Sequence, residues 1–196
     1  FTVDDFINAT HVDLSFVGDA DTTFKRITSQ GNRTTDLHQE DLSGQTGQNG
    51  HMFGTDADDL FWGAKWGQAL HGNLGNDTLR GGDGADTIVG GDGFDISDYA
   101  DATAGVTVDL IDSRQNTGFA KGDILIDIEG LGGSSFADSL VVDSLDNLVF
   151  GGAGADSIVG QDGHDRLNGG AGEDVIFGGA DWDSLYGGDQ NVYLDG

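Results

Sequence analysis

Apolar residues recur with a period of nine along two stretches of the chain, from Gly54 to Asp98 and from Gly133 to the C-terminus. The eighth position of a block is apolar in every block but one, where Ser97 stands, while the two positions that flank it vary. Side chains of a strand alternate between its faces, so the pattern predicts short strands whose middle residue points into a core. These inward residues are Phe61, Leu70, Leu79, Ile88, Leu140, Val149, Ile158, Leu167, Ile176, Leu185 and Leu194.

The first six positions of each block predict a tight turn, because they are rich in glycine, which reaches positive φ without a steric penalty. A turn and a three-residue strand make half a coil, and two nonapeptides complete a coil of 18 residues. The fold class that we expect is all-β. It is a right-handed parallel β-roll, or β-helix solenoid, with an irregular insertion and an N-terminal cap, in which two parallel sheets face each other across a thin core.

Charge narrows the functions that such a fold can serve. The chain has 35 acidic and 8 basic residues, a formal net charge of −27, and only three of the acids are glutamate. Aspartate, the shorter acid, suits turns and metal sites. So acidic a chain argues against nucleic acid as a partner, and no apolar run reaches the length of about 18 residues that a membrane span needs. The chain contains no cysteine nucleophile and neither of the catalytic motifs H-E-x-x-H and G-x-S-x-G, so we expect that it is not an enzyme.

The sixth position of the turn is the candidate metal ligand, because aspartate occupies it in most blocks. These residues are Asp59, Asp77, Asp86, Asp95, Asp138, Asp156, Asp165, Asp174 and Asp183. The blocks 81–89, 151–159 and 169–177 fit the pattern G-G-x-G-x-D-x-U-x at every fixed position, where U is a large apolar residue. In these repeats the chain resembles the repeats-in-toxin (RTX), or hemolysin-type, family of calcium-binding nonapeptide repeats.

The resemblance implies several bound Ca²⁺ ions, each held between two turns on the same edge of the roll, one coil apart. Each turn would lend its aspartate and main-chain carbonyls. The most regular pairs of turns are 72–77 with 90–95, 151–156 with 169–174, and 160–165 with 178–183, and 54–59 with 72–77 and 133–138 with 151–156 are less regular. Further candidate ligands are Asp83, Asp92 and Asp162 at the third position, and Gly72, Gly75, Gly82, Gly84, Gly91, Gly93, Gly152, Gly154, Gly163, Gly170, Gly172 and Gly179.

Three blocks depart from the pattern at the sixth position, where Gln68, Asn147 and Val192 stand. The first weakens the site with Asp86, the amide oxygen of the second can still bind calcium, and the third marks a terminal cap. The alternative hypothesis is that the aspartates only form turns. An EF-hand is excluded, because none of the three glutamates ends such a loop.

A roll of this kind has too small a core to fold by itself. Ordering the backbone costs about 1–2 kcal/mol per residue, whereas each buried leucine or isoleucine contributes only about 1.5–3 kcal/mol. Aspartates of adjacent coils, about 5 Å apart, also repel one another. We therefore expect the chain to stay unfolded at cytosolic calcium levels and to fold on binding extracellular calcium.

Four segments are expected. Residues 1–53 form an N-terminal cap or the remnant of a preceding domain, 54–98 the first repeat block, 99–132 an insertion that continues the stack, and 133–196 the second block with a terminal cap. The alternating runs 105–112 and 124–131 predict two strands in the insertion. A separate hairpin is the alternative.

The expected function is that of a secreted or cell-surface bacterial calcium-binding module with a structural, adhesive or assembly role. The alternative is a non-catalytic C-terminal accessory module of a type I-secreted enzyme, similar to the metalloproteases or alginate epimerases of the family. The ninth positions place Val141, Val159 and Phe177 in one outward row, a candidate surface for a protein partner or for self-assembly. Carbohydrate is a further candidate partner, which would stack on Trp62, Trp66 and Trp182.

Overall fold

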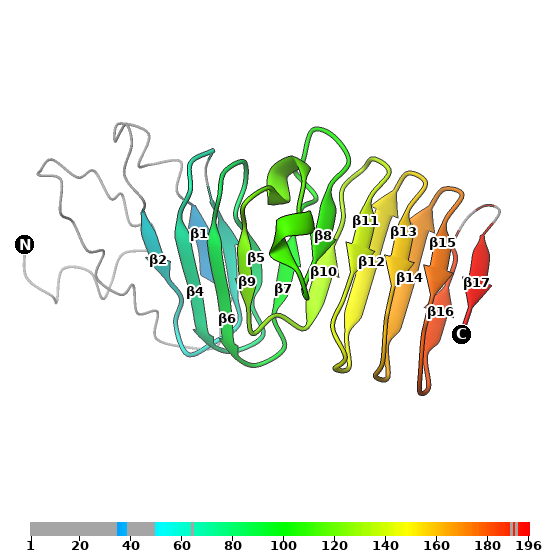
Figure 1. The fold of residues 1–196 in the computed structure, drawn as a ribbon. Helices are drawn as coiled ribbons and strands as arrows, with labels where there is room; N and C mark the ends of the chain where they lie inside the picture. Colours follow the sequence, from blue (N-terminus) through cyan, green and yellow to red (C-terminus); the bar gives the residue numbers. More distant parts are fainter. Residues whose placement is uncertain (1–34, 39–49, 64, 189, 191) are drawn as a thin grey trace, which may run out of the picture.

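The chain forms a flat roll of stacked two-stranded coils (Figure 1). The structure is a computed structural model that describes residues 35–38, 50–63, 65–188, 190 and 192–196. Within them nearly every element is a strand, each strand pair is parallel apart from one isolated bridge, and partners in the repeat blocks lie 18 residues apart. The fold class predicted from the sequence is confirmed, whereas residues 1–34 and 39–49, most of the expected N-terminal cap, lie outside the described residues.

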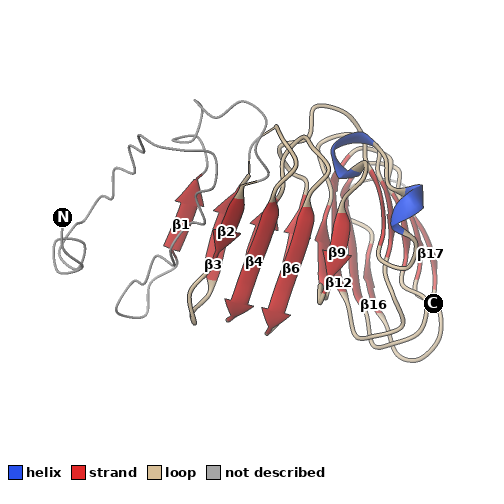
Figure 2. Cartoon of the chain, turned by 60° about the vertical axis from the view of Figure 1, so that its left-hand side comes forward, coloured by secondary structure: helices blue, strands red, loops and turns tan. Residues whose placement is uncertain are grey.

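One face of the roll is a single eight-stranded sheet, which we call sheet A, and the opposite face consists of two shorter sheets, B and C (Figures 1 and 2). Sheet A has the order β1 (Thr35–His38), β3 (Asp59–Trp62), β5 (Thr78–Arg80), β7 (Ile96–Asp98), β10 (Gly130–Gly132), β12 (Leu148–Ala153), β14 (Arg166–Ala171) and β16 (Ser184–Tyr186). Sheet B contains β2 (His51–Phe53), β4 (Ala69–Leu74), β6 (Thr87–Asp92) and β9 (Ile124–Ile126). Sheet C contains β8 (Thr107–Asp109), β11 (Ser139–Val141), β13 (Ser157–Val159), β15 (Val175–Phe177) and β17 (Tyr193–Asp195).

The eighth residue of each nonapeptide points into the roll, as the pattern predicts. In β13, for example, Ile158 is fully buried while its two neighbours are half-buried. In-register partners such as Val149 and Leu167 therefore stack into a continuous apolar column between the two faces. Leu194 is exposed because it lies in the last coil of the stack, where no further coil covers it.

Four strands, β4, β6, β12 and β14, have six residues, twice the three predicted. The extra residues come from the start of the next turn, where pairing continues between Gly152 and Gly170 and between Ala153 and Ala171. Glycine is required there: Gly170 has a φ of 97°, and a Cβ on it would collide with the carbonyl of Gly152. The turns are therefore hydrogen-bonded to one another along the stack.

The insertion enters the stack through three strands, β8, β9 and β10. Strand β9 pairs with β6 at a register of 37 residues (Thr87 with Ile124), β10 pairs with both β7 and β12, and β8 pairs with β11. The two predicted strand segments thus pair with different neighbours and form no hairpin. They are linked by two short 3-10 helices, η3 (Ser113–Gln115) and η4 (Gly118–Ala120). On the second face, β9 is the last strand of sheet B and β8 the first strand of sheet C, so that face is divided between them.

Candidate metal centres

The sixth-position aspartates line the two edges of the roll, where the chain turns from one face to the other. Each precedes a strand, and those before sheet A strands share one edge while those before sheets B and C share the other. All are buried except Asp183, which is half-buried. A row of buried carboxylates needs partners, because an unpaired charge in the protein interior is costly.

One carboxylate oxygen of each aspartate except Asp59 accepts a hydrogen bond from the preceding coil, whereas Oδ1 of Asp59 has no partner among the described residues. The backbone N–H of Asp77 donates to Oδ1 of Asp95 at 2.8 Å, and that of Asp156 donates to Oδ1 of Asp174 at 3.0 Å. The backbone N–H of Asp165 likewise donates to Oδ1 of Asp183 at 3.1 Å. The structure thus brings together the turns of the three most regular pairs, each in contact one coil apart.

The second carboxylate oxygen lacks a partner in most turns. Among the residues that the structure describes, the buried Oδ2 atoms without a hydrogen bond are those of Asp77, Asp86, Asp95, Asp156, Asp165, Asp174 and Asp183. Buried side-chain oxygens are rarely left without a hydrogen-bond partner in native structures, so each one needs an explanation. Both members of all three regular pairs are in this set.

Each of these oxygens faces the first glycine of its own turn, and those of Asp77, Asp95, Asp156 and Asp165 also lie beside a main-chain carbonyl of the next coil. A Cβ placed on Gly151 would lie 2.6 Å from Oδ2 of Asp156 and 2.5 Å from the carbonyl oxygen of Gly169. The glycine therefore leaves a space that a carboxylate oxygen and a carbonyl oxygen both border. Within the described residues no three Asp, Glu or His side chains lie close enough to hold a metal by themselves. A bound ion would need carbonyl ligands as well, the donor set that calcium accepts.

The second residue of the turn decides whether Oδ2 is free. Where that residue has positive φ, as at Gly152 (107°), Asn73 (81°) and Gln161 (74°), the aspartate of the block keeps an unpartnered Oδ2. Ser134 has no positive φ, and its N–H and Oγ donate to Oδ2 of Asp138 at 2.6 and 3.0 Å. In that block the serine supplies the partner that a metal would supply elsewhere.

Two of the expected ligands, Asp59 and Asp138, therefore differ from the others, because their Oδ2 atoms already accept hydrogen bonds. Asp138 has both oxygens satisfied, because Oδ1 accepts from the N–H of Val106 at 2.7 Å. Oδ2 of Asp59 accepts from the N–H and the hydroxyl of Thr55, at 2.6 and 3.0 Å. Asp59 and Asp138 are the first aspartates of the two pairs of turns that are less regular in sequence.

Burial makes the carboxylates hard to ionise without a metal. It raises the pKa of Asp86 to about 8 and that of Asp77 to about 7, and the charges of neighbouring carboxylates add to both effects. The same cause raises the pKa of Asp95, Asp156 and Asp165 to about 6, although the hydrogen bond from the preceding coil opposes it. A cation between the turns would remove this penalty.

The remaining predicted ligands fall into two groups. Asp83, Asp92 and Asp162 are exposed at the third position, so they present their carboxylates to solvent. Most of the glycines shape the turn through positive φ, while Gly72 and Gly84 do not. The positive-φ group is Gly75, Gly82, Gly91, Gly93, Gly152, Gly154, Gly163, Gly170, Gly172 and Gly179.

Two acidic residues of the insertion occupy sixth positions that the sequence interpretation missed. Oδ1 of Asp123 accepts from the N–H of Asp86 at 2.8 Å, and Oε2 of Glu129 accepts from that of Asp95 at 2.9 Å. The signal was present, because each acid precedes an inward leucine by two residues, Leu125 or Leu131, as in the repeats. Asp123 offers no free oxygen, since the hydroxyl of Tyr99 donates to its Oδ2 at 2.9 Å.

Comparison with protein-family models matches the chain to the RTX calcium-binding nonapeptide repeat, in four copies at residues 69–96, 132–167, 141–175 and 159–194. These segments contain every aspartate with an unpartnered Oδ2. A comparison with curated proteins gives no significant match. In the described part of the chain, no helix has the length and apolar character needed to cross a membrane.

Proposed function

Because the chain belongs to the RTX calcium-binding nonapeptide repeat family, whose cofactor is Ca²⁺, we propose that it is a β-roll that folds on meeting extracellular calcium and then serves as a structural or adhesive module. The observation that carries the proposal is the set of buried aspartate oxygens without partners at the edges of the roll. No catalytic role is assigned to the roll.

Three ions are proposed, one for each regular pair of turns. The pairs are Asp77 with Asp95, Asp156 with Asp174, and Asp165 with Asp183, each completed by carbonyls of the two glycine-rich turns. Bound calcium supplies positive charge and six to eight coordination positions for oxygen. The aspartates cross-link adjacent coils through the Oδ1 hydrogen bond and hold the ion with Oδ2, so binding and stacking occur together.

The place of action follows from the same physics. RTX repeats occur in secreted bacterial proteins. Extracellular calcium modules bind with Kd values of about 10⁻⁴–10⁻³ M, well above cytosolic calcium levels. The chain would therefore stay unfolded, and fit for export, inside the cell and would fold outside it.

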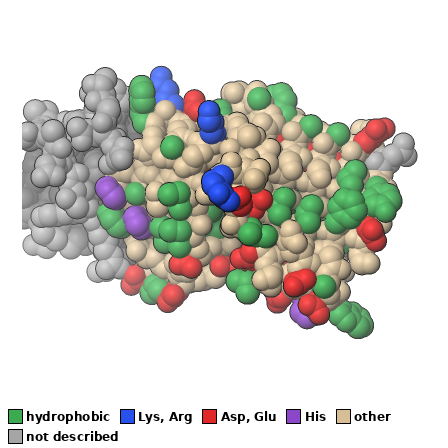
Figure 3. Space-filling view, viewed as in Figure 1, with side chains coloured by type: hydrophobic (Ala, Val, Ile, Leu, Met, Phe, Trp, Pro, Cys, Tyr) green, Lys and Arg blue, Asp and Glu red, His purple; other side chains and the backbone are tan. Residues whose placement is uncertain are grey.

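An outward apolar patch on sheet C, half-buried at its valines and exposed at Phe177, supports a structural or adhesive role over that of an accessory module of an enzyme. Val141, Val159 and Phe177 are partners in register on neighbouring strands. The ring of Phe177 lies 5.8 Å from that of Tyr193, which is 56% exposed. Figure 3 shows hydrophobic side chains gathered over the C-terminal coils. Such a patch is typical of a contact surface.

A calcium titration followed by far-UV circular dichroism tests the proposal, with magnesium as the control. We expect a cooperative gain of β signal at submillimolar to millimolar calcium and none with magnesium, which demands a tighter octahedral site. A fully folded spectrum in excess chelator would refute the folding switch, because the core alone would then suffice.

A further inference from the structure

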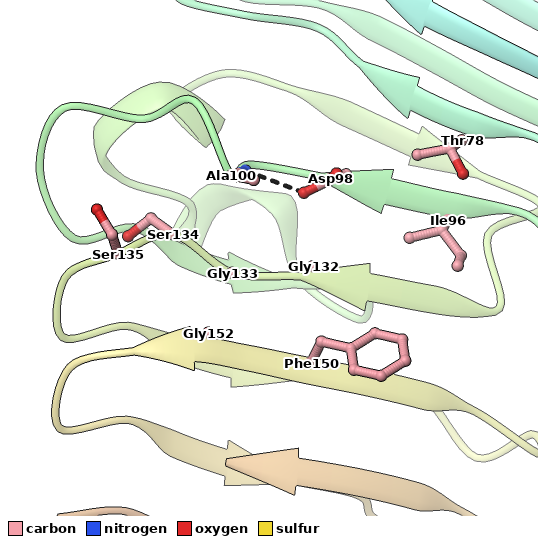
Figure 4. A pocket seen from close by; sticks show the side chains of 10 residues that line it. All are labelled: Thr78, Ile96, Asp98, Ala100, Gly132, Gly133, Ser134, Ser135, Phe150 and Gly152. Carbon is pink, nitrogen blue, oxygen red and sulfur yellow. Dashed lines mark hydrogen bonds between the residues drawn. The ribbon is translucent and has the colours of Figure 1, made fainter. Parts of the chain in front are cut away.

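A hollow lies on the outer face of sheet A, where strand β10 carries glycine at both outward positions, Gly130 and Gly132. It has a volume of about 480 Å³ and lies between Asp98 of β7 and Phe150 of β12 (Figure 4). The repeats place larger side chains at these positions on the neighbouring strands, so the hollow is a local departure from the pattern.

The walls of the hollow differ in chemistry. Phe150 is 44% exposed and forms an apolar wall. Asp98 forms a polar wall and is held in place, because Oδ2 accepts from Arg80 Nη2 and Nε at 2.6 and 2.9 Å and Oδ1 accepts from the N–H of Ala100 at 2.9 Å. Ser135, at the rim, is exposed. A concave site with an apolar platform and a few fixed polar groups is the usual form of a small-molecule site.

The apolar and polar groups continue along the roll from this hollow. Phe150, Asn168 and Tyr186 are partners in register on β12, β14 and β16, all at the ninth position. The two aromatic residues are therefore two strand spacings apart, about 10 Å, with an amide between them. Tyr186 is 62% exposed. We call Asp98, Phe150, Asn168 and Tyr186 the sheet A column.

This order of groups matches an extended chain of pyranose rings. A pyranose has flat faces of C–H groups, which suit the negative face of an aromatic ring, and hydroxyl groups at its rim, which suit an amide or a carboxylate. The spacing of the Phe150 and Tyr186 rings is about the length of one disaccharide unit in such a chain. The net charge of −27 disfavours polyanionic glycans, which the protein would repel.

We propose that the sheet A column binds a neutral glycan, with Phe150 and Tyr186 stacking on alternate sugar rings and Asn168 and Asp98 hydrogen-bonding their hydroxyls. The inference rests on the proposed function, because the column exists only in the folded roll, and it gives the adhesive role a ligand. Of the three tryptophans, Trp62 lies on the same face of sheet A, in register with Arg80 and two strands from Asp98, but outside the proposed column. Trp62 lies under Arg80, 5.7 Å from its guanidinium, while Trp66 and Trp182 lie in turns.

Isothermal titration calorimetry of the full chain in saturating calcium tests the inference, with cellohexaose, mannohexaose and an oligouronate as probes. We expect a neutral hexasaccharide to bind, and Phe150→Ala or Tyr186→Ala to weaken its binding at least about tenfold. Ile126→Ala is the control, since Ile126 is also an outward apolar residue, 43% exposed, but lies on β9 of sheet B, on the opposite face of the roll. It should leave the affinity unchanged.

Circular dichroism of every sample separates the two proposals. If the protein is folded and neither neutral probe binds, or if Ile126→Ala weakens binding as much as Phe150→Ala, the glycan site is wrong. Tighter binding of the oligouronate than of the neutral probes would also overturn it. A roll that folds without calcium and still binds the glycan through Phe150 would refute the calcium switch alone.

Discussion

Replacing Asp156 with asparagine should change stability in opposite directions with and without calcium. The Asn side chain keeps an oxygen that can accept the N–H of Asp138, as Oδ1 of Asp156 does at 2.9 Å. Its NH₂ group would replace Oδ2, which shares a space with the carbonyl of Gly169. The variant therefore removes one charged metal ligand. It adds an N–H group that can donate a hydrogen bond to this carbonyl, and it changes the shape of the side chain little.

The two effects can be estimated from the site. Burial raises the pKa of Asp156 from 3.8 to about 6, which corresponds to about 3 kcal/mol at most for ionising it at neutral pH. Screening at the edge of the roll reduces this to about 1–2 kcal/mol, the amount by which Asp156→Asn should stabilise the metal-free fold. In 10 mM calcium, a site with a Kd of about 10⁻⁴–10⁻³ M contributes about 1.4–2.7 kcal/mol, which the variant should lose.

Urea unfolding followed by circular dichroism measures both quantities, in 10 mM calcium and in chelator. An osmolyte at equal concentration in all samples keeps the metal-free fold populated. Glu173→Gln is the matched control, because it also removes one negative charge from a turn but from an exposed fifth position, and it should change little in either medium. If Asp156→Asn destabilises the roll equally with and without calcium, the sixth-position aspartates are only turn formers and the assignment of ligands is wrong.

Two further predictions concern pH and the number of ions. Because burial raises the pKa of Asp77, Asp86 and Asp156 to between about 6 and 8, the folded chain holds protons that the unfolded chain has released. This stabilisation is complete below pH 4 or so and is lost as the pH rises through 6 to 8. Calcium-stripped protein should therefore gain β signal in circular dichroism between pH 8 and pH 5, and a flat profile would contradict the raised pKa values. Ser134→Gly should free Oδ2 of Asp138, so calorimetry should find one more bound calcium than in the parent chain. An unchanged stoichiometry would show that the second residue of the turn does not control the site.

The sequence predicted those parts of the fold that depend on a local period. The inward eighth positions, the 18-residue coil and the contact between turns such as 151–156 and 169–174 follow from spacing alone. It did not predict that β8 pairs with β11, because a partner 32 residues away is selected by the stack as a whole. Asp123 and Glu129 were missed because their turns lack the glycine pattern, although the inward leucine two residues later marks both.

An aspartate at the sixth position does not by itself reveal whether its Oδ2 has a hydrogen-bond partner. That depends on the backbone φ of a residue four positions earlier. Ser134 and Gln161 are both polar substitutions for glycine, yet the first donates to its aspartate and the second adopts positive φ and leaves it free. The difference is conformational, and a pattern of residue types does not encode it.

The division of the second face into sheets B and C leaves the middle of the roll with a continuous strand ladder on one face alone. Among the described strands, the ladder β7–β10–β12 is the only one that runs from the first repeat block into the second, and it lies on sheet A. Bending that opens the opposite face, between β9 and β8, breaks no ladder of strand hydrogen bonds. The roll should therefore bend more easily in the direction that separates β9 from β8 than in the direction that the strand ladder of sheet A resists.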